Sequence, residues 1–382
     1  MALLAHSTFS PRVHQCLVRL GTELPFERVP ALAHLLLGVL VSAETVRRLT
    51  EAAGAAQVER EAAQRQQIHD EAPAGPAGPA VQQLSADGAM VPVVGGEWTE
   101  VRTLVLGTVE QDADGEGHAT NLRYFSRYCS AADFIEWVEL PLHEAGTARA
   151  GTVVAVQDGA DWLTQLLDAH CPDAVRILDF PHAAEYLTKA AQAAYGVGTP
   201  ASSAWLDTWC HKLKHGDPAA VIAAVRALPA PSEEAAAVRD GAAEYLSRRR
   251  AQLRYAIFQE QGYPIGSGAV ESANKLVVEH RLKGSGMHWS RENLTPMLAL
   301  RGILWTGRWD EEWPALWHQL CGTAQERRRQ HWVDRREVRR QAAQEQAARK
   351  AALAPPKTKV LPEEPTTMVN GRPTADHLWR HT

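Results

Sequence analysis

The most informative hydrophobic pattern is the run TVVAVQDGADWL, between Thr152 and Leu163. Its three valines are typical of a short buried strand, which ends at Asp158 and Gly159, and residues 160–169 behind it have the pattern of a helix. Open α/β sheets bind ligands at the carboxyl ends of their strands, so a carboxylate beside a glycine turn is a candidate for chemistry. Asp158 as a simple cap of the next helix is the alternative.

A hairpin is predicted upstream of this strand. The pattern indicates one strand from Asp87 to Val94, a Gly95-Gly96 turn, and a second strand from Val101 to Val109. Asp87 is an acid within an otherwise apolar strand. The sequence also indicates a short third strand near residues 121–126, a helix over 131–142 and a further buried strand over 174–179. A hairpin followed by βαβ units predicts an α/β fold with a mixed sheet and helices on its faces.

The pattern changes after residue 182, where strand signals stop. Three helices are predicted over 203–214, 217–228 and 233–260, which together make an all-helical insertion. A glycine-rich turn then leads into a helix that carries Glu271, Asn274, Lys275 and Arg281. Its glycines resemble a dinucleotide fingerprint only superficially, because Glu271 occupies the third glycine position and no βαβ unit follows.

The N-terminal region has the outline of a helix-turn-helix. Two short helices are predicted up to Gly54: one over 29–37, ending at Gly38, and a second that starts at Ser42 and ends at Gly54, with Val46 inward and both Arg47 and Arg48 outward. A helical hairpin that only packs is the alternative to one that reads DNA. A Gln-rich helix over 55–70 leads to the Pro/Gly segment 72–80, which is predicted to be a linker.

Charge is distributed unevenly along the chain. The net charge of -5 argues weakly against a nucleic-acid partner, but residues 248–350 hold 19 Lys and Arg against 11 Asp and Glu. That segment is therefore basic and the remainder acidic, so a phosphate-binding face is compatible with the composition. The helix over 325–350 is interpreted as either a solvated helix or a phosphate-tracking arm.

Composition limits the cellular setting. No apolar run is long enough for a membrane span, no signal peptide is recognisable, and the five cysteines form no CxxC pair. We therefore expect a cytoplasmic protein with no membrane partner. His211 and His215 lie beside Cys210, but no Glu follows the first His as a zincin requires, so they are interpreted as surface residues. The many tryptophans are expected to be mainly core anchors.

Three acids occupy comparable positions: Asp87 in the first strand, Asp158 at the end of a central strand, and Glu271 in the first turn of a helix. Magnesium prefers oxygen ligands and takes one or two carboxylates. Two such ions can activate the attacking oxygen and stabilise the leaving oxygen of a phosphoryl displacement. Capping or surface solvation is the alternative for each acid taken singly.

Four blocks of the chain resemble those of a known enzyme family: DGAMVPVVGGEW from Asp87, VVAVQDGADWL from Val153, ILDFPHAAEYL from Ile177, and IGSGAVESANKLVVEHRLKGSGMHWS from Ile265. They are similar to the blocks of DDE transposases of the ISKra (ISKra-four) insertion-sequence family, which have a Mutator-like organisation. The likeness covers residues 9–313, with more in the closing GRPTADHLWRH.

This resemblance implies a ribonuclease H-like core, a helical insertion between the second and third acids, and catalytic, metal-binding roles for Asp87, Asp158 and Glu271. Two Mg²⁺ ions are implied, with Mn²⁺ as a substitute. The family also implies a supporting acid and histidine, which match Asp179 and His182; a strand-end cap beside a helix-start histidine is the alternative.

The implied partners are DNA, namely the element's terminal inverted repeats and target DNA, and further copies of the chain on that DNA, in association with the bacterial nucleoid. We expect phosphate contacts from basic residues in the helix-turn-helix region, the helix after Glu271 and the basic helix: Arg47, Arg48, Lys275, Arg281, Lys283, Arg335 and Arg336.

The resulting domain division is a helix-turn-helix-like region (1–71), a linker (72–80), the core (81–182), the insertion (183–262), a helix with Glu271 followed by C-terminal helices (263–320), a basic helix (321–354) and a disordered tail (355–382). Family members carry cysteine pairs upstream of the helix-turn-helix, so we expect an N-terminally shortened chain; a truncated copy, a frameshift and a misassigned start all remain open. A decayed or non-catalytic DNA-binding protein and a structure-selective nuclease are the alternative functions.

Overall fold

The fold is described from a computed structural model, which describes residues 9–284, 286–353, 368–369 and 372–373. The chain divides into two compact units, Met1–Gly322 and Thr323–Thr382. Each unit is described by itself.

The first unit is built on one mixed sheet of five strands in the order β3-β2-β1-β4-β5. β1 pairs antiparallel with β2 and β2 with β3, whereas β4 runs parallel to both β1 and β5. The predicted mixed α/β fold is confirmed, and the sheet is compatible with a ribonuclease H-like core. The strands are β1 Val81–Pro92, β2 Trp98–Gln111, β3 Gly117–Arg127, β4 Thr152–Gln157 and β5 Val175–Leu178.

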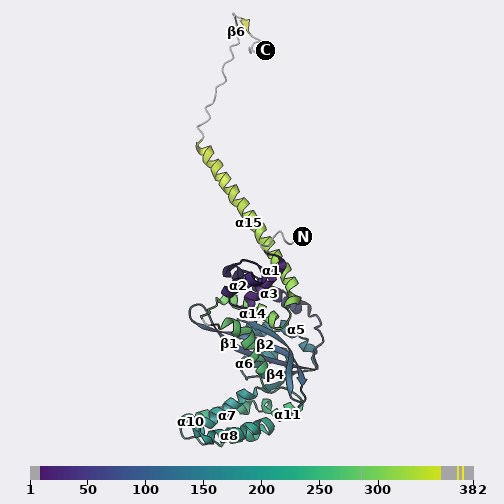
Figure 1. The fold of residues 1–382 in the computed structure, drawn as a ribbon, viewed down its shortest axis with the longest axis vertical. Coiled ribbons are helices and arrows are strands. Elements are labelled where there is room, and N and C mark those ends of the chain that lie inside the picture. Colours follow the sequence, from purple (N-terminus) through teal and green to yellow (C-terminus); the bar gives the residue numbers. More distant parts are fainter. Residues whose placement is uncertain (1–8, 285, 354–367, 370–371, 374–382) are drawn as a thin grey trace. The chain divides into compact units, whose positions relative to one another are not determined.

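Helices cover both faces of the sheet. Figure 1 shows the insertion helices gathered at one end of the first unit and α1, α2 and α3 at the other, with the sheet between them. The helices of this unit before the insertion are α1 Pro11–Glu23, η2 Phe26–Arg28, α2 Val29–Leu37, α3 Ala43–Glu71, α4 Ala131–Trp137, α5 Glu139–Glu144, η3 Thr147–Arg149 and α6 Asp161–His170. Those that follow are α7 Phe180–Tyr195, α8 Pro200–His215, α9 Pro218–Arg226, α10 Glu233–Arg248, η4 Arg250–Leu253, α11 Tyr255–Glu260, α12 Gly268–Ala273, η5 Asn274–Glu279, α13 His280–Leu282, α14 Arg291–Trp305 and α15 Trp309–Leu353, the last of which continues into the second unit.

Alternation along the strands separates two apolar layers. Leu84 and Ala86 of β1 pack with Leu104 and Leu106 of β2 beneath α4, α5 and α6. Ala89 on the opposite face of β1 packs instead beneath η5 and α14. On that same face, but over β4 and β5, the cover comes from the insertion. Asp87 and Ala89 are two residues apart in β1, so their side chains lie on the same face of the sheet. The insertion covers one part of that face, and the α12–α14 region covers the other.

The insertion takes no part in the sheet. Residues 183–261, all of them described, contain helices and turns, and every strand of the five-stranded sheet comes from elsewhere. The predicted helix over 233–260 is broken, because the chain turns after α10 so that Leu253 and Tyr255 can bury against the β4–β5 layer. The Tyr255 hydroxyl donates to the Leu178 carbonyl at 2.8 Å, which fixes that turn to the end of β5.

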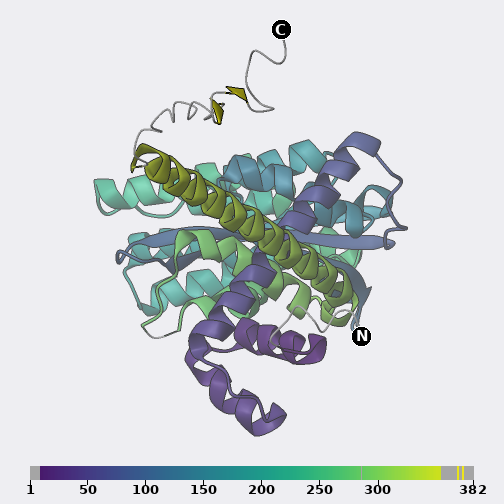
Figure 2. The same ribbon diagram turned by 90° about the horizontal axis from the view of Figure 1, so that it is seen from above.

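The predicted end of the second N-terminal helix at Gly54 is wrong. α3 is one uninterrupted helix from Ala43 to Glu71 (Figure 2), with Ser42 as the predicted N-cap. A Cβ on Gly54 would lie 2.4 Å from the Pro296 carbonyl oxygen of α14. The glycine therefore permits close crossing of two helices instead of ending one, since tertiary contact overrides weak helix propensity.

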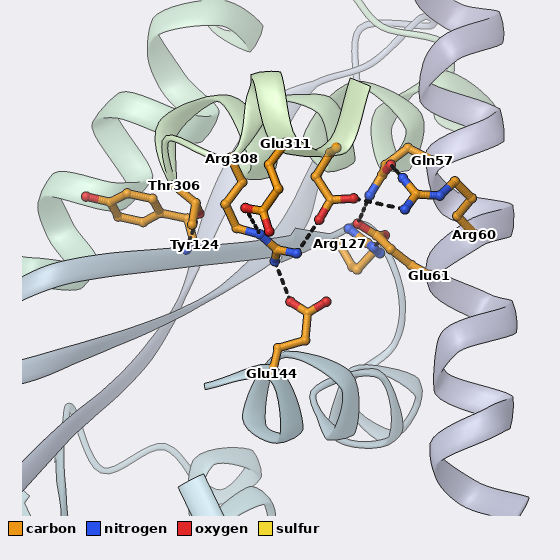
Figure 3. Close-up of polar contacts among 10 residues, drawn as sticks. Gln57, Arg60, Glu61, Tyr124, Arg127, Glu144, Thr306, Arg308 and Glu311 are labelled. Carbon is orange, nitrogen blue, oxygen red and sulfur yellow. Dashed lines mark hydrogen bonds and ion pairs between the residues drawn. The ribbon is translucent and has the colours of Figure 1, made fainter. Parts of the chain in front are cut away.

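Polar contacts hold α3 on the core. Figure 3 shows Arg60 and Glu61 of α3 meeting charged groups from other elements, while Gln57 bonds to both of them within the helix. Glu61 accepts from the fully buried Arg127 of β3, and Arg60 donates to Glu312 at 2.9 Å. Arg308 joins Glu312 to Glu144 of α5. The helices before residue 72 and the sheet consequently belong to one compact unit, and the predicted linker does not divide it.

The segment 72–80 has no helix or regular strand, as predicted, but it lies against the core. Its carbonyls at Pro73 and Gly75 accept from His143 and Arg149. In the second unit, the predicted basic helix is the later part of α15. Most of the predicted disordered tail lies outside the described residues, and its described positions pair as β6 Met368–Val369 and β7 Arg372–Pro373.

Candidate metal centre

The register of two parallel strands brings Asp87 and Asp158 together. β1 pairs with β4 from Val81–Thr152 to Leu84–Ala155, an offset of 71 residues. Asp87 and Asp158 are separated by the same 71 positions, so continuing the register by three residues aligns them. Neighbouring strands lie about 4.8 Å apart, and aligned residues on parallel strands point to the same face.

Electrostatics places the two carboxylates within interaction range. Burial raises the pKa of Asp87, and the negative charges of Asp158 and Glu100 raise it further. Hydrogen bonds from the Gly88 amide (2.7 Å) and the Asn274 amide (2.9 Å) oppose this shift. No Lys or Arg of the described residues is among the causes of this shift, and none of them forms an ion pair with Asp87.

Asp158 lies at the first position after β4, in a tight turn. Its Oδ1 accepts from the Ala160 amide at 2.8 Å, which makes an Asx turn that orients the carboxylate. Gly159 follows with φ of +82°, a conformation that favours glycine, and a Cβ there would lie 2.6 Å from Arg249 Nε. The predicted tight turn and carboxylate at the strand end are therefore both present.

Glu271 belongs to a helix that packs on the same face of the sheet as Asp87. α12 packs against β2 through Val270 and Ala273, which contact Val105. Asn274 lies three residues after Glu271, and positions three apart share a helix face. Because Asn274 donates to Asp87 Oδ2, the face that carries Glu271 is directed toward the Asp87 region.

The third carboxylate does not complete a closed triad. Glu271 is exposed, and its carboxylate forms no hydrogen bond or ion pair with the residues that the structure describes. Among those residues, the only three potential ligand groups with atoms all within 4.8 Å of one another belong to Asp112, Glu116 and His118. The structure thus brings the first two predicted acids into electrostatic contact and leaves the third exposed, on the helix that leads to Asn274.

The helix after Glu271 is irregular where it passes Asp87. η5 is π-helical from Asn274 to Glu279, and π-helical turns are frequent at functional sites. Arg301, fully buried, supports it by donating to the Leu276 and Val277 carbonyls, and it also donates to Thr22 at 3.0 Å. A buried cation thereby satisfies carbonyls that the altered helix turn presents.

The donor set fits hard divalent cations. Among the residues that the structure describes, no basic side chain pairs with the carboxylate of Asp87 or Asp158, and a like-charged pair of this kind is stabilised by a cation. Asn274, only 6 % exposed, has a buried Oδ1 without a hydrogen-bond partner while its Nδ2 is engaged by Asp87. Asp87, Asp158, Asn274 and Glu271 are the residues that could hold Mg²⁺ or Mn²⁺, with water and a phosphate oxygen filling the remaining positions.

The comparison with protein families covers most of the chain. The model of an uncharacterised protein family, UPF0236, matches residues 6–313. The chain belongs to the UPF0236 family. The matched region contains the sheet, the insertion and all three acids. No curated protein matches the sequence.

In this UPF0236 chain, Asp179 and His182 have structural contacts. Asp179 Oδ2 accepts from the His182 amide at 3.0 Å, so Asp179 caps α7, as the alternative interpretation held. Its Oδ1 accepts from the Ser267 amide at 2.6 Å, at the start of the helix with Glu271. Asp179 therefore links the end of β5 to α12, and this link supports the position of the third acid.

The predicted phosphate contact by Arg281 is wrong. Its side chain is 2 % exposed, donates to the Gly21 carbonyl at 3.1 Å, and lies over the rings of Phe26 and Trp289. Burial lowers the pKa of Arg281 to about 10. A guanidinium enclosed between aromatic rings and a helix end is a packing element, and it is not accessible to a DNA backbone.

The remaining predicted DNA contacts differ in availability. Arg47 forms ion pairs with Glu44 and Glu51, and Lys283 donates to Glu279 at 2.5 Å, so both are already engaged. Side chains that are exposed, and therefore accessible to phosphates, are those of Arg48, Lys275, Arg335 and Arg336.

Sequence reasoning missed the residues that hold the two aspartates. Asn274 was noted as a member of the helix but not as a partner of Asp87, and Tyr245 and Arg249 were not singled out. Tyr245 donates to the Asp158 carbonyl and Arg249 to the Gly159 carbonyl, each at 2.6 Å. The one available signal was the position of Asn274, a helical turn after Glu271; nothing local marked the other two.

Other clusters carry no comparable site. His211 and His215 have ring centroids 4.7 Å apart and are accessible on α8, in agreement with the prediction of surface residues. Asp112 and His118 pair at 2.8 Å on the exposed β2–β3 turn, where hydrogen bonds within the turn account for them. No helix among the described residues combines the length and apolar character needed to cross a membrane.

Proposed function

We propose that this protein is a DDE transposase of an insertion sequence, cutting and joining DNA strands by two-metal phosphodiester chemistry. The observation that carries the proposal is the β1–β4 register, which aligns Asp87 with Asp158 when it is continued three residues beyond its last pair; burial and the charge of Asp158 both raise the pKa of Asp87. The resemblance of four sequence blocks to ISKra-type transposases, which includes all three acids, supports the same function.

The three acids have distinct roles in this proposal. Asp87 and Asp158 would hold the metal ions together, and Glu271 would contribute a further carboxylate. Mg²⁺ held by these residues would supply activation of the attacking oxygen and stabilisation of the leaving oxygen. Cleavage breaks a P–O bond as water forms a new one and leaves a 3′ hydroxyl; joining repeats the displacement with that hydroxyl as the attacking group on target DNA.

DNA is the proposed partner, with further copies of the chain assembled on it. Lys275 is exposed on the helical segment that follows Glu271, so it is available to contact a DNA phosphate. Arg335 and Arg336 are exposed on the later part of α15, which is rich in arginine. Such contacts give affinity that falls steeply with salt and carries little sequence information.

The test is a cleavage assay on DNA that contains the flanks of the gene, in Mg²⁺ and in Mn²⁺. Asp158→Asn keeps the side-chain shape and removes the charge, so we expect loss of cleavage with DNA binding retained. Asp173→Asn, the same change at an exposed position between α6 and β5, is the matched control and should cut normally.

Each contrary result identifies a different function. Cleavage by Asp158→Asn at the wild-type rate would remove Asp158 from the metal site. Binding without cleavage by the wild-type protein, even with any upstream coding region restored, would indicate a non-catalytic DNA-binding protein. Cleavage without joining would indicate a nuclease.

A further inference from the structure

The turn that carries Asp158 is not completed by the sheet. The β4–β5 pairing ends with Gln157 and Leu178, and the Asp179 amide donates to the Gln157 carbonyl at 2.8 Å. The next two carbonyls, of Asp158 and Gly159, have no strand partner. Their donors come from the insertion: the Tyr245 hydroxyl and the Arg249 guanidinium, 87 and 90 residues away in the sequence.

Both donors are themselves held in place. The Tyr245 ring stacks on that of Tyr186 of α7, with centroids 3.9 Å apart and planes 8° apart. The Arg249 guanidinium lies 4.0 Å from the centroid of the Tyr245 ring. Burial raises the pKa of Tyr245 well above its usual range, so the hydroxyl remains a donor. The side chains reach the turn as a preorganised pair, and each donates to one carbonyl.

The backbone geometry of the Asp158–Gly159 turn determines where the Asp158 carboxylate lies, so the hydrogen bonds from Tyr245 and Arg249 affect the position of that carboxylate. Asp158 Oδ1 is oriented by the Ala160 amide, so a shift of the backbone at 158–160 moves the carboxylate with it. Gly159 leaves room for Tyr245 and Arg249: a Cβ there would lie 2.7 Å from the hydroxyl oxygen and 2.6 Å from Arg249 Nε. Metal ligands must be held within a narrow range of geometry, and their supporting hydrogen bonds tune affinity.

We propose that the end of α10 is a positioning element for the metal centre, in which Tyr245 and Arg249 hold the Asp158–Gly159 turn in its metal-binding geometry. The role rests on the proposed two-metal function. It gives the insertion a purpose beyond separating the second and third acids. Tyr245 also stacks on Tyr186 of α7, and Asp179, which caps α7, accepts from the Ser267 amide at the start of α12. The Asp158 turn is thereby connected to α12 through α7.

The first test measures metal affinity without DNA. Tyr245→Phe retains the ring stack and removes one donor, and Arg249→Met removes the other. A single hydrogen bond contributes only modestly to the stability of the turn. We therefore expect the dissociation constant for Mn²⁺ to rise by about threefold to tenfold in each variant. The binding is measured from the paramagnetic resonance signal of free Mn²⁺. Tyr195→Phe and Arg248→Met, at exposed positions on α7 and α10, are the matched controls and should bind as the wild type does.

The second measurement separates positioning from general loss of structure. Hydrogen exchange at residues 157–161 should accelerate in Tyr245→Phe and Arg249→Met while exchange in β1 and β4 is unchanged. Cleavage by the variants should recover toward the wild-type rate at saturating Mn²⁺, because a positioning defect weakens metal binding more than it slows the bound enzyme.

Unchanged Mn²⁺ affinity together with unchanged exchange at residues 157–161 would overturn the positioning role. A cleavage rate that stays low at saturating Mn²⁺ would also overturn it, and would indicate a direct role in the reaction or disrupted folding. Absence of Mn²⁺ binding by the wild-type protein would refute the two-metal function instead; the exchange measurement would then decide alone whether Tyr245 and Arg249 hold the turn.

Discussion

Replacing Asp87 with asparagine should stabilise the metal-free protein and abolish its response to Mg²⁺. Asp87 is partly buried next to Asp158, without a basic partner, and both burial and Asp158 raise its pKa. At neutral pH the folded protein therefore holds two like charges together. In the Asp87→Asn variant, the oxygen of the new side-chain amide can still accept from the Asn274 amide, so the structure around it should be retained.

The size of the effect follows from the strand geometry. Two unit charges about 5 Å apart, at an effective dielectric constant of about 20, repel by roughly 3 kcal/mol, and water at a partly exposed site reduces this. The substitution also removes the hydrogen bond from the Gly88 amide, because the side-chain NH₂ replaces the oxygen that accepts it, and this costs about 1 kcal/mol. We expect a net stabilisation of about 1 kcal/mol at pH 7, seen as a rise in Tm of about 2 °C for a unit of this size.

The pH dependence gives the sign. The folded-state pKa of Asp87 lies above its ordinary value of 3.8, so its contribution to stability is present below that value and is lost as the pH rises through the folded pKa. The variant should match the wild type in acid and exceed it above this range. Calorimetry in EDTA across this range, repeated in Mg²⁺, measures both effects: Mg²⁺ should raise the wild-type Tm and leave that of Asp87→Asn nearly unchanged.

Parallel stability curves for the two proteins at all pH values, or a less stable variant at pH 7, would show that Asp87 and Asp158 do not repel each other in the folded protein. An equal gain in Tm from Mg²⁺ in both would show that the ion binds elsewhere. Asp173→Asn, which removes an exposed carboxylate, should change neither measurement.

Two further predictions concern packing and DNA contact. Gly54→Ala should lower the free energy of unfolding by about 1 to 3 kcal/mol in urea titrations, because its Cβ would meet the Pro296 carbonyl oxygen at 2.4 Å. Gly241→Ala, in open space on α10, should instead raise the free energy of unfolding by about 0.5 to 1 kcal/mol. Equal changes in the two variants would refute the close crossing of α3 and α14. The double variant Arg335→Ala, Arg336→Ala should bind DNA with a weaker salt dependence: the slope of log binding constant against log salt concentration should fall in magnitude by about 2. The cleavage rate of bound DNA should not change. An unchanged slope would show that these residues make no phosphate contacts.

Local pattern determined much of the architecture. The β-branched run before Asp158 predicted β4, the Gly95-Gly96 turn predicted the β1–β2 hairpin, and the absence of strand signals predicted the helical insertion. These features follow from periodicity and turn chemistry within a few residues, which a sequence displays directly. Asp87 and Asp158 could be nominated for the same reason, since an acid is conspicuous in or after an apolar strand.

Tertiary structure decided which of the nominated residues meet and which are enclosed. The sequence around Arg281 suggests a surface cation on a helix. In the structure its guanidinium is buried and donates to the carbonyl of Gly21, 260 residues away. Gly54 resembles a helix end in the sequence, but in the structure it permits the close crossing of α14. Nothing in the sequence around Tyr245 indicates that its hydroxyl donates to the Asp158 carbonyl. Each outcome depends on a partner distant in the chain, and hydrogen bonding or close packing with such a partner outweighs the local preference of any single residue.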